Sequence, residues 1–479
     1  MPTSWQLECL KARIQSLDRE IKRVADKEHP YTEPDTIYRA LLRVLDSWGT
    51  HFDEARDLVP TDTDSMLDPV FKRVAIEVDK VFRVFGLADR VDSARIPFEI
   101  LRSLAWAATE LLDEQCKIVV RLDTAYNYSI TSFRRMFEQL NWGKFWAETA
   151  ENHSDSEPRK STVLVLGFPS PDASAILLHA LAAHELGHEI LDRYHSEIER
   201  IRVRLLNDAK GVYRDQLEEY ILDNMRRGGG VSRDDAYEKA RQQLEVRLDN
   251  ACSKWISEIW SDLVAIRLVG PASLAAFDRV TLNEGSPSDS HPSGLLRRRV
   301  AERYVREKMP HIAEDPICSS VFLSPATSLS ERQLSPSSQL LKTLYPLLDY
   351  VCTRSLDPLS NVLDQVASPI GNKSILAKVE RLEEFLDNLA PPNAALGKED
   401  IKPSSFWLLI YAAWHFRLSE LRFQSFCAKH GDSADREMGE AALCNLLLHG
   451  VKSLELEYQW DRSQPHTPGE PQFGAAHGA

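Results

Sequence analysis

The stretch HALAAHELGHEIL, residues 179–191, has the apolar spacing of a buried helix, yet it carries three histidines and two glutamates. Burying such groups costs free energy unless each one is paired or bound to a metal ion. On a helix, His184 and His188 lie about 40° apart around the axis and one turn apart along it, so both imidazoles can reach one ion. Glu185 is turned about 100° away, where its carboxylate can contact a water on that ion without ligating the ion. The HExxH spacing therefore predicts a zinc site of the hydrolase type.

A third protein ligand is expected in WISEIWSDLVAIRLV, residues 255–269. The only charged residues of this segment are Glu258, Asp262 and Arg267, and the rest is largely apolar, which is typical of a buried helix. Glu258 and Asp262 are four residues apart and share a helix face, so burying both without partners would be unfavourable. We predict that Glu258 is the third zinc ligand and that Asp262 accepts the outer N–H of a ligating histidine. The alternative is that both acids pair with arginines elsewhere in the chain.

HELGH at 184–188, followed by EIWSD at 258–262, resembles the gluzincin metallopeptidases. EIWSD is similar to the ExxSD of thermolysin-like enzymes, and the wide spacing looks more like the HtpX and CAAX-prenyl-protease group. SHPSGLLRRRV at 290–300 is similar to the His-Pro segment of that group, which has an arginine a few residues on. The resemblance implies a zincin-like core, one catalytic zinc per chain and peptidase activity. The chain departs from that group because it has no comparable membrane span, and its polar insertion at 195–254 belongs to neither pattern.

With two histidines and one glutamate on zinc, the fourth coordination position is open to water, whose pKa the metal lowers toward 7. Glu185 is expected to take a proton from this water as general base and to pass it to the leaving amine of a protein or peptide substrate. His291 lies ahead of Pro292 in a loop-forming stretch and is predicted to stabilise the oxyanion, although an ordinary surface histidine is the alternative. Other candidate donors are Tyr194, Tyr213 and Tyr220.

Helical spacing over most of the chain predicts a mainly α protein with a small β element. The expected parts are a helical N-terminal region at 1–150, a zincin-like catalytic domain at 151–310 with a helical insertion at 195–254, a linker at 311–338, a helical C-terminal region at 339–460 and a disordered tail at 461–479. STVLVLGFP, residues 161–169, is the best strand candidate. This strand either pairs with an extended peptide substrate or is a plain structural strand.

Several conspicuous residues are expected to be structural. The arginine run at 297–299, with Arg303 and Arg306, fits a solvated helix face, from which one member could meet a substrate carboxylate. His179 is turned about 140° from His184 on a helix and fits a hydrogen-bonded core histidine. Core positions are also expected for Trp142, Trp146, Trp255, Trp260, Trp407 and Trp414.

Composition and charge narrow the class of protein. Lys and Arg number 58 against 72 for Asp and Glu, a net charge of −14, which argues against nucleic acid or an anionic membrane as the main partner. The N-terminus has no apolar run typical of a signal peptide, and no run reaches the roughly 18 to 20 residues of a membrane span. The seven cysteines are dispersed without a CxxC pair, which favours reduced thiols. We therefore expect a cytoplasmic protein.

Two further functions remain open from the sequence. One is a helical interaction or sensor protein whose zinc site is structural and is closed by a fourth protein ligand. The other is a regulated peptidase whose flanking helices sense a partner protein, so that the purified chain is normally inactive.

Overall fold

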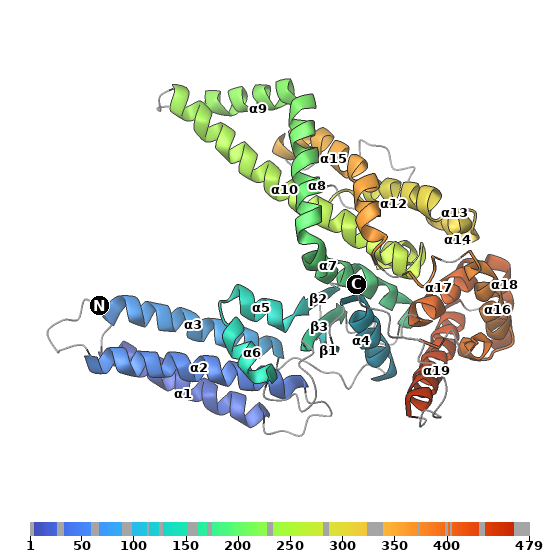
Figure 1. Cartoon of the computed structure of the whole chain (residues 1–479), viewed down its shortest axis with the longest axis horizontal. Helices are drawn as coiled ribbons and strands as arrows, with labels where there is room; N and C mark the ends of the chain where they lie inside the picture. The colour runs from blue at the N-terminus through green and yellow to red at the C-terminus, as the bar shows by residue number, and fades with distance from the viewer. Residues whose placement is uncertain are drawn as a thin grey trace, which may run out of the picture.

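The fold is mainly helical with one small sheet, as the sequence predicts. In Figure 1 the sheet and α7 lie at the centre, with the first helices at one side and the last helices at the other. The structure is a computed structural model that describes residues 4–25, 33–58, 67–88, 98–112, 115–123, 128–151, 161–169, 175–227, 233–280, 287–322, 339–366, 368–371, 373–397, 401–402, 405–430 and 436–463.

Three long helices at the N-terminal end lie side by side (Figure 1). Their apolar faces build a hydrophobic core together with two short helices. The sheet contributes Val119, Val163 and Val165 to this N-terminal core, so the helices pack against the centre of the molecule. The helices are α1 (Ser4–Ala25), α2 (Glu33–Leu58), α3 (Leu67–Ala88), α5 (Phe133–Gln139) and α6 (Gly143–Glu151).

Among the described residues, the sheet has three strands in the order β1-β3-β2. β3 (Ser161–Pro169) lies in the middle, parallel to β1 (Gln115–Asp123) and antiparallel to β2 (Ser129–Ser132). Successive side chains of a strand point to opposite faces. Val163 and Val165 of β3 therefore pack into the N-terminal core, whereas the leucines between and after them pack into the main core that contains α7.

Helix α7 (Leu181–Leu191) carries the HELGH motif and packs closely against α10 (Arg233–Val269). The approach is closest at Gly187, where a Cβ atom would lie 2.7 Å from Cα of Ser261. The Trp260 ring nitrogen donates to the Gly187 carbonyl at 3.1 Å across the same contact. Glycine inside the motif, unfavourable in a helix by itself, is thus explained by the close packing of the two helices.

The helices that follow α7, up to and including the first part of α10, form an arm that projects from the body (Figure 1). A 3-10 turn at Asp192–Tyr194 joins α7 to α8 (His195–Val212), and α9 (Arg214–Arg227) follows. The arm returns through the first part of α10, so the described parts of the expected insertion, 195–227 and 233–254, are helical.

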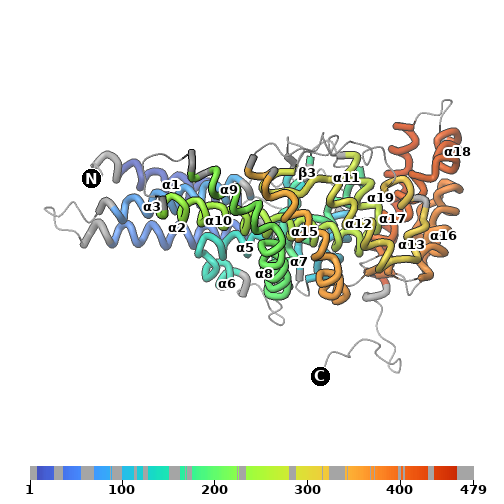
Figure 2. The backbone as a smooth tube through the Cα atoms, turned by 90° about the horizontal axis from the view of Figure 1, so that it is seen from above, coloured from blue at the N-terminus to red at the C-terminus, as the bar shows by residue number. Residues whose placement is uncertain are grey.

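The C-terminal helices form the end of the molecule opposite the N-terminal bundle (Figure 2). The main core continues into them through apolar residues of α15 and α17. The remaining helices of nine or more residues are α4 (Phe98–Leu112), α11 (Ala272–Val280), α12 (Gly294–Lys308), α15 (Gln339–Leu363), α16 (Ile375–Asp387), α17 (Ser405–Leu418), α18 (Glu420–His430) and α19 (Arg436–Ser463).

The N-terminal region at 1–150 is not helical throughout, which corrects the prediction. β1 and β2 lie within it and pair with β3. β2 has four residues, too few for its pattern to predict a strand. The tail expected at 461–479 lies outside the described residues, apart from the three that end α19.

The linker expected at 311–338 also needs correction, because its first part is folded. Two short helices, α13 (Pro310–Ala313) and α14 (Pro316–Phe322), lie there, and both pack into the main core. Each begins with a proline, which suits the first turn of a helix. The Asp315 carboxylate accepts the Ile317 amide at 2.9 Å and caps α14. Pro310 and Pro316 therefore mark the starts of helices and not a linker.

No single helix among the described residues is both long and apolar enough to cross a membrane. Only α10 and α11 together meet those criteria, by length and composition, as a pair bent by 119°. Both helices contribute fully buried residues to the main core, among them Trp255, Leu263 and Ala272.

Candidate metal centre

Three side chains from two helices meet at one point. His184 and His188 come from α7 and Glu258 from α10, and one ligand atom of each lies within 4.8 Å of the others. The Nε2 atoms of the two histidines are 3.2 Å apart. One carboxylate oxygen of Glu258 lies 3.5 Å from Nε2 of His184, and the other lies 3.5 Å from Nε2 of His188. All three residues predicted as ligands are therefore together.

These separations fit the coordination of one metal ion. Tetrahedral bonds of about 2.0–2.2 Å to nitrogen and oxygen place two ligand atoms about 3.3–3.5 Å apart. The side chains of His184, His188 and Glu258 are 13%, 27% and 12% exposed, so the group is mostly buried and His188 is the most open to solvent. The three residues could hold a metal ion.

The outer nitrogens of both imidazole rings have hydrogen-bond partners. Nδ1 of His184 lies 3.0 Å from Oδ1 of Asp262, the residue predicted to orient it. Because an ionised carboxylate only accepts, Nδ1 carries the proton and leaves the Nε2 lone pair toward the shared point. Nδ1 of His188 lies 3.1 Å from Oγ of Ser257, which the sequence analysis missed. Ser257 directly precedes Glu258, and this proximity was the available signal.

Arg297 is buried beside the cluster, which corrects its assignment to a solvated helix face. Its Nε and one terminal nitrogen each donate to Asp262 at 2.6 Å, and its other terminal nitrogen lies 3.5 Å from Glu258. Its guanidinium group lies over the Phe277 ring at 4.5 Å. Arg298 is buried as well and donates to the Val321 carbonyl at 3.0 Å. The alternative of an arginine partner for the acids is therefore correct alongside the histidine contacts.

The charges around the cluster set its protonation. Burial alone would lower the pKa of His184, but the hydrogen bonds of its ring with Asp262 and Glu258 outweigh burial and raise that pKa to about 10. Burial and the neighbouring His184 lower the pKa of His188 to about 4. Burial alone would raise the pKa of Glu258, but His184 and Arg297 lower it to about 2. The cluster offers an ionised carboxylate and a neutral imidazole, and metal binding would displace the remaining proton from His184.

Glu185 lies beside the cluster and is not one of its three ligands. Burial raises the pKa of its carboxyl group, and the nearby Glu258 carboxylate adds to this rise. The neighbouring His184 ring and the backbone of Ile130 in β2 act in the opposite direction and lower this pKa. A raised pKa in a glutamate next to a metal group suits proton transfer near neutral pH.

His291 lies at the rim of the cluster, with its side chain 59% exposed. Its Nε2 is 3.6 Å from Oε1 of Glu258, and its Nδ1 is 2.8 Å from Oγ of Ser290. The backbone amide of His291 donates to Oγ of Ser288 at 3.0 Å, and the Trp255 ring nitrogen donates to the Ser288 carbonyl at 2.9 Å. The loop that carries His291 is thus anchored on α10, the helix of Glu258.

The remaining candidate residues pack into or against the hydrophobic cores. Tyr194 is buried, and its ring centroid lies 5.6 Å from that of Trp260. The ring centroids of Tyr213 and Tyr350 are 6.3 Å apart. Tyr220 packs against the main core, and His179 is buried. All six tryptophans predicted in the core are buried: Trp142, Trp146, Trp255, Trp260, Trp407 and Trp414.

Of the two roles predicted for the strand at 161–169, pairing with a peptide substrate or a plain structural strand, the structure shows the second. β3 is paired with β1 on one edge and with β2 on the other, so it has no edge free for a peptide. The strand next to α7 is β2.

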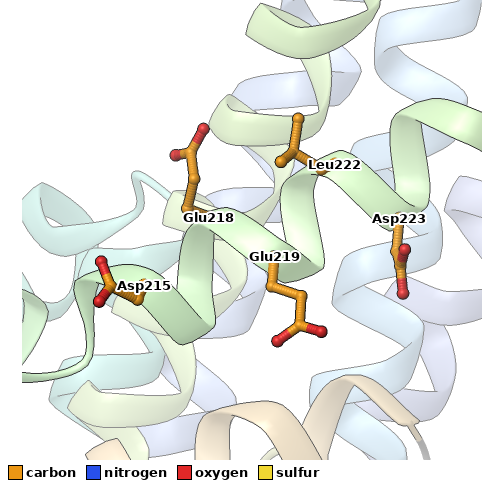
Figure 3. Close-up of a pocket in the computed structure, with 5 residues that line it drawn as sticks. All are labelled: Asp215, Glu218, Glu219, Leu222 and Asp223. Carbon is orange, nitrogen blue, oxygen red and sulfur yellow. The ribbon is translucent and has the colours of Figure 1, made fainter.

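A hollow on the surface of α9 is lined mainly by acidic residues. None of its lining residues belongs to the cluster of His184, His188 and Glu258. In Figure 3 the carboxylates leave the helix in different directions and do not converge on one point. This surface is a solvated helix face. Its lining residues are Asp215, Glu218, Glu219, Leu222 and Asp223.

Comparisons with protein-family models, with curated proteins and with solved structures return no match for this chain.

Gly187 allows a test of how the cluster is assembled. The change Gly187→Ala would put a methyl group against the backbone of Ser261, so α7 must move away from α10, which carries Glu258. We expect a loss of about 1–3 kcal/mol in the free energy of unfolding and weaker metal binding. The matched control is Gly211→Ala in α8, where nothing lies within 4 Å of the added atom and alanine should be neutral or stabilising. Thermal unfolding and metal titration measure both; equal behaviour of the two variants would contradict the close packing.

Proposed function

We propose that this protein is a zinc-dependent metallopeptidase with a zincin-like core, which hydrolyses peptide bonds of a protein or peptide substrate. The observation that carries the proposal is the group of His184, His188 and Glu258, whose ligand-atom separations of 3.2 and 3.5 Å suit tetrahedral zinc. Two imidazoles and one carboxylate are one of the ligand sets of catalytic zinc sites, which keep one position for water. Glu185 next to this group supplies the carboxylate that such hydrolysis needs.

Each residue has a definite task in the proposed reaction. When bound, zinc would supply a water of lowered pKa and polarise the substrate carbonyl. Glu185 accepts a proton from that water and donates it to the leaving amine. Asp262 holds the His184 ring in the orientation that turns Nε2 to the metal, and Arg297 holds Asp262 with two hydrogen bonds. His291 is the candidate donor to the oxyanion.

The proposal is tested on the purified full-length chain. We expect about one zinc ion per chain by elemental analysis and slow cleavage of an unfolded protein such as reduced casein. Removing the metal with a chelator should abolish cleavage, and added zinc should restore it. Cleavage that survives complete metal removal would rule the proposal out.

His291 separates the peptidase from the alternative of a helical interaction or sensor protein with a structural zinc. Its ring nitrogen lies near Glu258, so His291 is also the residue best placed to close the site as a fourth ligand. For the peptidase we expect His291→Ala to lower kcat by about 100- to 1,000-fold with the zinc content unchanged. Steady-state kinetics and zinc titration measure the two effects.

The control for His291→Ala is His195→Ala, an exposed histidine at the start of α8, which should change neither quantity. Loss of zinc from His291→Ala, in proportion to any loss of activity, would favour the closed structural site. Unchanged turnover would return His291 to the ordinary surface role.

A further inference from the structure

A tight turn at residues 288–291 presents His291 to the metal centre. The backbone amide of Ser288 donates to the His291 carbonyl at 3.0 Å, which closes the turn. The Trp255 ring nitrogen donates to the Ser288 carbonyl at 2.9 Å and attaches the turn to α10. Trp255 is fully buried and lies three residues before Glu258, about 60° from it around the helix axis. The turn is therefore held close to the face of α10 that carries Glu258.

The hydroxyl group of Ser288 has its acceptor capacity filled by the backbone of this turn. Its oxygen accepts from the amide of Ser290 at 3.3 Å and from the amide of His291 at 3.0 Å. A hydroxyl group has two lone pairs and one proton, so only its proton is left for a further contact. That contact is with Oγ of Ser290, which lies 3.1 Å away. Ser288 is therefore the donor in the contact of the two serines.

Ser290 links the hydroxyl group of Ser288 to the histidine ring. Its Oγ lies 2.8 Å from Nδ1 of His291. Because Ser290 accepts the proton of Ser288, its own proton remains available for the ring nitrogen. A neutral imidazole has one nitrogen that donates and one that accepts. The serine pair, Ser288 and Ser290, therefore favours Nδ1 of His291 as the accepting nitrogen.

The opposite side of the ring leads to the same assignment. Nε2 of His291 lies 3.6 Å from Oε1 of Glu258, which is longer than an ordinary hydrogen bond. An ionised carboxylate only accepts, so it repels a lone pair on Nε2 and attracts an N–H group there. Glu258 thus favours Nε2 as the donating nitrogen, in agreement with the serine pair.

The position of this proton decides what His291 can do at the metal centre. Coordination through Nε2 requires its lone pair, so a ring with the proton on Nε2 does not bind a metal through that atom. The same ring offers an N–H group that can stabilise a negatively charged oxygen. One tautomer of His291 suits an oxyanion donor, and the other suits a fourth ligand.

We propose that Ser288 and Ser290 are positioning residues, whose hydroxyl groups hold the neutral His291 ring in the tautomer with its proton on Nε2. The ring is thereby a donor at the metal centre and not a fourth ligand. The effect of the serine pair on catalysis rests on the proposed peptidase function, whereas the tautomer does not.

The tautomer is measured by nitrogen NMR of the zinc-loaded full-length chain, with its histidines isotopically labelled. The signals of His291 are those that disappear in His291→Ala. In mildly alkaline buffer, where an ordinary imidazole carries one proton, we expect the proton of His291 on Nε2 and none on Nδ1. A proton on Nδ1 with zinc on Nε2 would overturn the proposal.

The contribution of the serine pair to turnover is tested by Ser290→Ala and Ser290→Thr. Threonine keeps a hydroxyl group that can donate to Nδ1, and alanine does not. For Ser290→Ala we expect kcat to fall about 10-fold, with KM and zinc content little changed, because the donor is no longer held in place. Ser290→Thr should restore kcat. The matched control is Ser319→Ala, an exposed serine of α14, which should change none of these quantities.

A double-mutant cycle shows whether Ser290 acts through His291. Residues that act together are not additive, so Ser290→Ala should cause no further loss of kcat in a chain that already carries His291→Ala. An equal loss in both backgrounds, or a change of KM with kcat unchanged, would overturn the positioning role. A proton on Nε2 in a chain that cleaves nothing would support the tautomer and count against the peptidase.

Discussion

Replacing Glu185 by glutamine is expected to leave zinc bound and to lower kcat by about 100- to 10,000-fold. Glutamine has the shape of glutamate, but its neutral amide cannot take a proton from water. Glu185 is not among the three ligands, so the metal should stay. The measurement is steady-state cleavage of an unfolded protein by zinc-loaded parent and variant, with zinc content determined on the same samples.

The matched control for Glu185→Gln is Glu197→Gln, which makes the same change on the arm. A Glu185→Gln variant that cleaves as fast as the parent would show that no general base acts at this position. A variant that loses its zinc would instead place Glu185 among the ligands.

The second large effect is expected from Glu258→Ala, which should weaken zinc binding more than Asp262→Asn does. Glu258 would supply an oxygen to the metal, whereas Asp262 would act through the ring of His184. Loss of an orienting partner costs about 10- to 100-fold in metal affinity, and loss of a direct ligand should exceed this range. Competition titration with a zinc chelator measures both variants.

Asp262→Asn has an additional consequence that tests the role of Arg297. The substitution removes the carboxylate that accepts both hydrogen bonds of this buried guanidinium and leaves Glu258, at 3.5 Å, as its ionised neighbour, which we expect to cost about 3–5 kcal/mol in the free energy of unfolding. Denaturant unfolding of Asp262→Asn beside Glu258→Ala separates stability from metal affinity. Stronger zinc binding by Glu258→Ala than by Asp262→Asn would contradict the assignment of the third ligand.

The metal group was predictable because its signals are local. His184 and His188 are one turn apart on a helix, and Glu258 and Asp262 are one turn apart on another, so each pair specifies a face before the tertiary structure is known. Both faces belong to largely apolar segments, α7 and residues 255–269 of α10, and buried polar groups of such segments need a partner side chain or a metal.

Arg297 was not predictable by the same reasoning. Three consecutive arginines at 297–299 point to three directions around α12, and their sequence gives no signal for which direction is buried. The burial of Arg297 follows from the packing of α12 against α10, which places it on Asp262. An acid left unpaired in a buried helix was the signal that an arginine partner was required.

The sheet was predicted in part. β3 has an apolar run bounded by turn residues and is recognisable alone, whereas β2 is defined by its partners and not by its own pattern. The two short helices in 311–338 were not predicted, because prolines at helix starts look the same in sequence as prolines of a linker.

The most direct test of the central claim is the coordination of zinc in the full-length chain, measured by X-ray absorption at the zinc edge. The account predicts two imidazole nitrogens, oxygen from Glu258 and oxygen from water, all at about 2.0–2.2 Å, with one imidazole lost in His188→Ala. A site with three imidazoles and no water, a site with sulfur ligands, or a purified chain that binds no zinc would contradict it.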